Sequence, residues 1–134
     1  NHYSTTCMKA IKIEGTPTSP TIKFDPKIGK LEIKGRSVPE STLEFYRPLL
    51  ETLDEYIASP VSPTQVDIYL DYFNTTSSKC LLDMFRRIKD IENKGSKVIV
   101  NWFYEKDDED MQKVGVDYQA IVNLKFNMLE AKQM

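Results

Sequence analysis

The chain has 134 residues, of which 40% are apolar and 28% are charged, and its net charge is -2. This is the balance of an ordinary soluble globular protein that can bury a core, so we expect one domain over residues 1–134. With no basic block, no long apolar run and no signal-peptide core, the sequence argues against nucleic-acid binding, membrane insertion and secretion, and we expect a cytoplasmic protein.

The N-terminal part of the chain predicts short strands. Residues 8–13, "MKAIKI", alternate in polarity, and the glycine and prolines of residues 14–20 then break regular structure. Residues 21–24 and 30–34 alternate again and are joined by "DPKIG", so we expect a hairpin there. The segment "GRSVPES", residues 35–41, is expected to be a loop.

A long helix is expected over residues 41–58. Its apolar side chains recur at helical spacing and predict one buried face: Leu43, Tyr46, Leu49, Leu50, Leu53 and Ile57. Pro48 lies inside this helix. Because proline removes one backbone hydrogen bond and costs about 3 kcal/mol in a helix interior, we expect a kink or a break there.

The centre of the chain predicts a strand over residues 66–73 and a helix over residues 77–93. One strand face carries Val66, Ile68, Leu70 and Tyr72. The other face, which is expected to be half buried, carries Asp67, Tyr69, Asp71 and Phe73. The helix has an apolar stripe of Leu81, Met84, Phe85, Ile88 and Ile91. Gly95 provides a stop signal.

The last third predicts strand, helix and strand. Residues 98–104, "VIVNWFY", are almost continuously apolar, which predicts a central strand covered on both faces. The acidic segment 105–115 suits a short surface helix. Residues 121–126 are expected to form an edge strand, and the tail beyond Leu129 is expected to be helical or frayed. Strand–helix–strand units imply right-handed crossovers. The predicted fold class is therefore α/β (α+β), a mixed sheet with helices packed on it.

Four consecutive hydroxyl residues stand between the strand and the helix at the centre of the chain: Thr75, Thr76, Ser77 and Ser78. Ser and Thr cap helix starts well, which is the first interpretation. Yet one cap needs one hydroxyl, no acid follows until Asp83, and Lys79 lies near the positive end of the helix. A phosphate here would bring about -1.5 to -2 of charge, which the helix end and Lys79 could receive. The second interpretation is a phosphorylation switch.

Other reactive side chains are sparse. Cys7 and Cys80 have neither a disulfide-framework nor a zinc spacing, and we interpret them as small apolar residues in a reducing compartment. The single histidine, His2, lies at the N-terminal end, away from any motif that needs one. No Gly-rich phosphate loop occurs. We therefore predict no catalytic residue, no metal site and no cofactor.

Three motifs carry a resemblance to a known family. "YFNTTSSKCLLDM" resembles the strand-to-helix segment of the SiaC family of bacterial regulatory phosphoproteins. "GRSVPES" resembles the family's Gly-x-Ser-x-Pro-Glu-Asn loop, with Ser41 in place of Asn, and "VNWFYEKDDEDMQKVGVDY" its aromatic strand and acidic turn. The motifs occur in the family's order, and Thr76 stands where the family pattern has Ser.

The resemblance implies a fold similar to STAS domains, the class of anti-sigma-factor antagonists, and a place in a partner-switching module. Its partners would be a Ser/Thr protein kinase, a PP2C-type phosphatase and an effector such as a diguanylate cyclase, with a role in cyclic di-GMP and biofilm regulation. In the best-known member of the family, the unphosphorylated form binds and activates the cyclase. By position the phosphoacceptor would be Thr75, which follows Asn74, in a loop that continues through Thr76, Ser77, Ser78 and Lys79.

Two surfaces are candidates for partner binding. The first is the exposed face of the helix that starts near Ser77, with Lys79, Arg86 and Arg87. The second is Glu40 with Ser41, although Glu40 fits equally well as an acid of the first turn of its helix. The acids of residues 105–111 suit either a solvated turn or a surface for a basic partner.

Two other classes of function are also compatible with the sequence. A small hydrolase could use Ser77 or Thr75 as nucleophile, with Asp71 or Asp67 as the candidate base. An unmodified scaffold or ligand-binding domain is the third class. The hydrolase would need a base, and none is visible apart from these two carboxylates.

Overall fold

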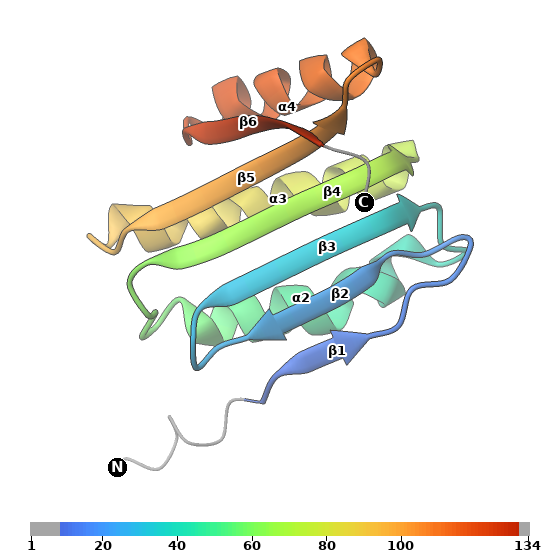
Figure 1. The fold of residues 1–134 in the computed structure, drawn as a ribbon. Coiled ribbons are helices and arrows are strands. Elements are labelled where there is room, and N and C mark those ends of the chain that lie inside the picture. Colours follow the sequence, from blue (N-terminus) through green and yellow to red (C-terminus); the bar gives the residue numbers. More distant parts are fainter. Residues whose placement is uncertain (1–8, 132–134) are drawn as a thin grey trace.

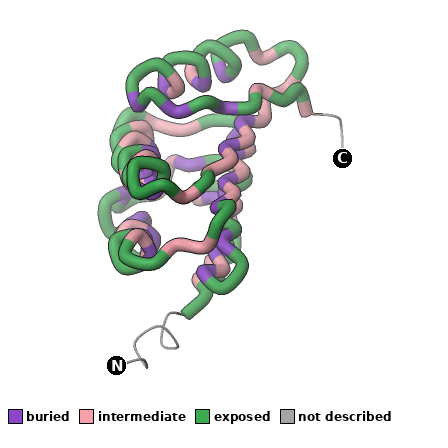
Figure 2. Tube along the Cα trace, turned by 90° about the vertical axis from the view of Figure 1, so that its left-hand side faces the viewer, coloured by how far each residue is buried: buried purple, intermediate pink, exposed green. Residues whose placement is uncertain are grey.

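The computed structural model describes residues 9–131, which form a six-stranded mixed sheet with three helices on one of its faces (Figures 1 and 2). The elements in chain order are β1 (Ile11–Ile13), β2 (Thr21–Asp25), β3 (Lys30–Ser37), α2 (Thr42–Tyr56), β4 (Thr64–Phe73), α3 (Thr75–Asn93), β5 (Val98–Glu105), α4 (Glu109–Val122) and β6 (Phe126–Ala131). The predicted fold class is confirmed.

The strands lie in the sheet in the same order as in the chain, β1 to β6. The pairs β1–β2 and β2–β3 are antiparallel, whereas β3–β4, β4–β5 and β5–β6 are parallel and are joined through α2, α3 and α4. Successive right-handed crossovers that move in one direction across a sheet place their helices on the same side. Figure 2, which shows the sheet edge-on, has the helices on one side of it. The other face of the sheet is referred to below as the open face.

The core lies between the helices and the sheet. The predicted stripe of α3 is confirmed, since all five of its apolar side chains are buried. They pack with inward-facing side chains of the strands, among them Val66, Ile68 and the fully buried Trp102. Cys80 is also buried, and burial raises the pKa of its thiol. The other cysteine, Cys7, and His2 lie outside the described residues.

Helix α2 differs from the prediction in two ways. It runs without a break across Pro48, which is exposed. Leu43 is 65% exposed rather than buried, and Tyr56 completes the buried face. The helix starts at Thr42, so Leu43 lies in its first turn. The interpretation of Glu40 as a first-turn acid is wrong, because Glu40 precedes the helix and Glu44 occupies that position.

A bulge at the end of β4 accounts for another difference. Gly35 pairs with Leu70 but Arg36 pairs with Tyr72, so Asp71 is an extra residue in the ladder. An extra residue inverts the alternation of side chains beyond it. Tyr72, predicted to share the buried face of Val66 to Leu70, is therefore 51% exposed. The same strand pairing extends β3 through Ser37, so residues 35–37 are not part of the loop predicted for residues 35–41.

The remaining boundaries differ at both ends of the chain. The strand expected over residues 8–13 is shorter, Ile11–Ile13, and Met8 lies outside the described residues. The short helix expected over residues 105–115 extends to Val122 and ends at Asn123, which adopts a left-handed conformation with φ 56°. The last strand therefore lies at Phe126–Ala131, not at residues 121–126, and the tail to Ala131 is not helical.

Within residues 9–131, strand β5 is covered by helices on one face only, which corrects a further prediction. Val100 and Trp102 face the helices and are buried, whereas Asn101 and Phe103 face the other way and are half buried. All three crossover helices lie on one side, so the described residues provide no second layer for the other face of this strand. The expectation that the face of Asp67 and Tyr69 is half buried is confirmed.

Gly115 of α4 has no room for a side chain. A Cβ there would lie 2.5 Å from Cδ1 and 2.6 Å from Nε1 of Trp102, whose indole N–H is held by the Met111 carbonyl at 3.0 Å. A Gly115→Ala variant is therefore expected to be destabilised by about 1–2 kcal/mol in urea unfolding, because overpacking outweighs the gain of about 1 kcal/mol in helix propensity. The neighbouring exposed change Val116→Ala is the control. Equal stability of the two variants would mean that the indole does not restrict position 115.

Candidate phosphoacceptor site

The strand-to-helix corner is built on the N-terminus of α3. Asn74 ends the extended backbone, with φ -87° and ψ 174°, and its side-chain oxygen accepts a hydrogen bond from the Ser77 N–H at 2.8 Å. Asn74 is therefore the N-cap, and the helix begins at Thr75, two residues before the predicted start. The interpretation of the hydroxyl run as the cap is wrong: an amide side chain performs that role.

The four hydroxyls separate into two exposed and two internal positions. Thr75 and Thr76 are exposed at the first two helical positions. Ser77 is fully buried, and its hydroxyl donates to the Ser37 carbonyl oxygen at 3.0 Å. Ser78 lies against Tyr118, with 2.8 Å between the two hydroxyl oxygens. Each internal hydroxyl thus joins α3 to another element.

A buried chain of hydroxyls runs beneath the corner. The Ser37 hydroxyl donates to that of Ser77 at 2.8 Å and lies 2.6 Å from the Tyr46 hydroxyl, so β3, α2 and α3 are linked. The Asn74 N–H also donates to the Ser37 carbonyl, at 3.1 Å. Burial raises the pKa of Tyr46 to about 12, opposed in part by its hydrogen bond to Ser37. Tyr46 is therefore a neutral donor, and the corner is rigidly supported from below.

Tyr118 of α4 supports the corner from the other side. Its hydroxyl donates to the Ser78 carbonyl at 3.0 Å, and burial raises the pKa of Tyr118 to about 12, opposed by its hydrogen bond to the Ser78 side chain. Ser37, Tyr46 and Tyr118 were not predicted as parts of this site. The sequence signal that could have indicated them is that buried tyrosines need a hydrogen-bond partner for their hydroxyls. The identity of that partner is not visible locally, because Tyr118 lies 40 residues from Ser78 in the chain.

The charges within the first turns of α3 favour an anion. The first turn of α3, Thr75 to Ser78, holds no acidic residue, and a helix N-terminus carries a partial positive charge. Lys79 is exposed and lies four residues after Thr75, which places the two side chains on the same side of the helix. A negative group on the Thr75 oxygen would thus meet the helix end and an ammonium group.

The structure brings together only part of the predicted partner surface. Glu40 and Ser41 are both exposed, and they follow Ser37, which is paired with Phe73 in the parallel ladder, so they leave the sheet at the same edge as the corner. Arg86 is exposed but lies about 16 Å along the helix from Thr75, at 1.5 Å per residue. Arg87 donates to Asp54 of α2 at 2.7 Å and so joins two helices. These arginines are not at the corner.

The hydrolase interpretation finds no support in the geometry of residues 9–131. The Ser77 hydroxyl faces Ser37, not a carboxylate. Asp71 lies 3.8 Å from the Arg36 guanidinium, and Asp67 accepts hydrogen bonds from Gln65 and Asn101. Within the same residues there is no cluster of three potential metal ligands, and no helix is long and apolar enough to cross a membrane.

Fold and corner define a mixed α/β domain with two exposed threonines at a supported strand-to-helix junction. Comparison with protein families identifies its kind: residues 13–131 match the model of the SiaC family regulatory phosphoproteins, and the chain belongs to that family. The predicted family is thereby confirmed.

A relative and solved structures from one organism are similar to this chain. An uncharacterized protein of Pseudomonas aeruginosa strain UCBPP-PA14 is 25% identical over 119 residues, which are 89% of this chain and 94% of the relative. The crystal structure of apo-SiaC from P. aeruginosa is similar with a TM-score of 0.84 and 24% identity, covering 91% of this chain and 99% of that one. A third match is the crystal structure of the diguanylate cyclase SiaD in complex with its activator SiaC, also from P. aeruginosa. Its TM-score is 0.84 and its identity 24%, covering 90% of this chain and 99% of that one.

Proposed function

We propose that this protein is a non-enzymatic, cytoplasmic signalling phosphoprotein in which reversible phosphorylation of Thr75 selects the partner that binds. Its partners are a Ser/Thr kinase, a PP2C-type phosphatase and an effector. The observation that carries the proposal is the division of the hydroxyl run: Thr75 is exposed beside Lys79, whereas Ser77 is buried and Ser78 is held by Tyr118. The similar SiaC is the activator of a diguanylate cyclase, so an enzyme of that class is the first effector to test.

The proposed mechanism is a change of charge at a rigid corner. A phosphate on Thr75 adds about -1.5 to -2 of charge and three acceptor oxygens. Asn74 already caps the Ser77 N–H, so the phosphate meets the earlier N–H groups of the helix and Lys79. Because the support below is buried, the fold stays the same and only the surface changes. The unphosphorylated corner binds the effector, and the added charge and its hydration oppose that contact.

The acceptor is tested by intact-mass analysis of the protein purified from its source cell. A Thr75→Ala variant should lose the phosphate-bearing form, whereas the matched exposed variant Thr76→Ala should retain it. If the phosphate form persists in Thr75→Ala and disappears in Thr76→Ala, the acceptor is Thr76 rather than Thr75. No phosphate form under any growth condition would refute the switch.

The switch is tested by binding to the purified diguanylate cyclase of the source organism. Thr75→Glu is expected to weaken binding relative to Thr75→Ala by roughly 5- to 150-fold, the usual range for coupling between sites. Thr76→Glu and Thr76→Ala form the matched pair and should differ less. Identical affinities for the two Thr75 variants would favour an unmodified scaffold.

A further inference from the structure

A hollow of about 250 Å³ adjoins the phosphoacceptor corner, between the end of β4 and the first turn of α4. Its apolar wall is formed by Phe73, Met111 and Val114. Phe73 precedes Thr75 by two residues, and its ring stacks on that of Tyr118, with 6.5 Å between the ring centroids. Because Tyr118 also holds Ser78, the hollow and the exposed acceptor belong to one supported surface.

The described residues that line this hollow include three carboxylates and no lysine or arginine: Asp71, Asp108 and Asp110. Asp71 lies 3.8 Å from the Arg36 guanidinium, which balances its charge. Within residues 9–131 neither Asp108 nor Asp110 forms an ion pair, and Asp108 accepts the Met111 N–H at 2.9 Å as the N-cap of α4. Residues 105–113 hold five acids and two lysines, a net charge of -3. The hollow is therefore left with an unbalanced negative charge.

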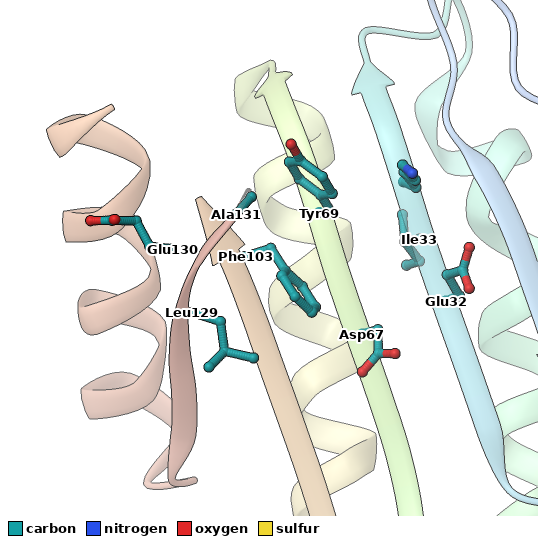
Figure 3. Close-up of a pocket in the computed structure, with 9 residues that line it drawn as sticks. Glu32, Ile33, Asp67, Tyr69, Phe103, Leu129, Glu130 and Ala131 are labelled. Carbon is teal, nitrogen blue, oxygen red and sulfur yellow. The ribbon is translucent and has the colours of Figure 1, made fainter. Parts of the chain in front are cut away.

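The larger hollow on the open face has a different charge balance. Figure 3 shows this hollow, which measures about 560 Å³ and is lined by Tyr69, Phe103 and Leu129. Lys30 approaches Asp67 at 4.0 Å, and Lys34 is among the lining residues. Glu130 points away from the hollow (Figure 3). The charges of the open face thus select no partner, whereas those of the hollow at the corner favour a cation.

Size and charge together fit one basic side chain. Pockets for small-molecule ligands usually measure about 300–1,000 Å³, so a hollow of about 250 Å³ lies below that range. Lysine and arginine side chains combine a stem of methylene groups with a charged end. The stem would lie against Phe73 and Val114, and the charged end would meet Asp108 and Asp110.

The charge at Thr75 indicates which partner would carry this side chain. A phosphate on Thr75 would attract a basic group beside it more strongly, which is the opposite of what release of the effector requires. The phosphatase meets a corner that already carries the charge of the phosphate. The kinase, by contrast, approaches before the phosphate is attached and brings ATP, whose phosphates the acids of the hollow repel. A cation of the kinase in the hollow would offset that repulsion.

We infer that this hollow docks a lysine or arginine side chain of the protein kinase that phosphorylates Thr75. The inference rests on the function proposed above and adds the surface by which one partner is recognised. Asp108 and Asp110 hold the kinase but do not touch the transferred phosphate. Their loss should therefore raise KM for this protein as a substrate and leave kcat unchanged.

The test measures phosphate transfer to Thr75 by the Ser/Thr kinase purified from the source organism. Asp108→Asn and Asp110→Asn each remove one charge from the hollow, and asparagine caps a helix as well as aspartate does. Each should raise KM by roughly two- to fivefold, as for an exposed ion pair, and the increase should shrink at high salt. Glu109→Gln is the matched control and should leave KM unchanged, because Glu109 is exposed in the same turn and does not line the hollow.

The outcomes separate the docking site from the switch. Equal KM values for the three variants and the parent chain would overturn the docking site, while transfer to Thr75 of the parent would still support the switch. No transfer to Thr75 of the parent would refute both. A fall in kcat without a rise in KM would place the acids in the transfer step and overturn docking. Binding of Asp110→Asn to the diguanylate cyclase should equal that of the parent, and a matching loss there would assign the hollow to the effector instead.

Discussion

A Ser77→Asp variant is expected to lose about 3–5 kcal/mol of folding free energy, whereas Thr76→Asp should be as stable as the parent chain. The Ser77 hydroxyl is fully buried and donates to the Ser37 carbonyl at 3.0 Å. A carboxylate cannot donate, so it would face that carbonyl as a second buried acceptor. The helix N-terminus offsets this by only about 0.3–1 kcal/mol. At the exposed Thr76 position a carboxylate interacts with the helix N-terminus without the cost of being buried.

The measurement is urea unfolding at neutral pH, with Ser77→Ala as the matched control. Ser77→Ala loses the hydrogen bond and leaves the Ser37 groups with fewer partners, which costs about 1–3 kcal/mol. A larger loss in Ser77→Asp isolates the cost of the charge, and this excess should shrink at acid pH, where the carboxyl regains a proton to donate. If Ser77→Asp and Thr76→Asp were equally stable, the burial of Ser77 would not decide which hydroxyl can carry a phosphate.

The sequence could locate the corner because its signals are local. The polarity alternation of residues 66–73, the stripe of α3 and the run of hydroxyls lie within 30 residues of each other. The cap was assigned to the wrong residue for a local reason as well. Asn is as good an N-cap as Ser, and Asn74 precedes a run in which every residue is a credible cap.

The division of the hydroxyls could not be predicted, because it depends on long-range pairing. Ser77 is buried by Ser37, which is 40 residues earlier, and Ser78 by Tyr118, which is 40 residues later. The bulge that exposes Tyr72 arises from the pairing of β3 with β4, and nothing in the sequence of β4 alone marks it. The open face of β5 was missed for a related reason: an apolar strand is compatible with one covered face or two, and the direction of the crossovers decides.

Raising the pH from 10 to 12 is expected to destabilise this protein strongly, because two tyrosines that support the corner then lose their protons. Burial raises the pKa of Tyr46 and that of Tyr118 to about 12 from an ordinary 10.0. The unfolded chain therefore loses these protons first, so the stabilisation is complete below pH 10 and is lost as pH rises toward 12. At about 1.4 kcal/mol per pKa unit, each tyrosine contributes roughly 2–3 kcal/mol to this loss.

The free energy of unfolding of the parent chain, measured in urea at several pH values, should fall across this window. Tyr118→Phe removes the proton and the hydrogen bond to the Ser78 carbonyl, so it should cost about 1 kcal/mol at pH 8 yet flatten the fall above pH 10. Tyr72→Phe, at an exposed position, is the control.

Because Tyr46 holds Ser37 beneath Ser77, and Tyr118 holds Ser78, the same alkaline range should release the start of α3 before the rest of the helix. A parent chain whose stability is constant from pH 8 to pH 12, or a Tyr118→Phe curve parallel to that of the parent, would mean that these hydroxyls are not held in the core and that the corner is not rigid.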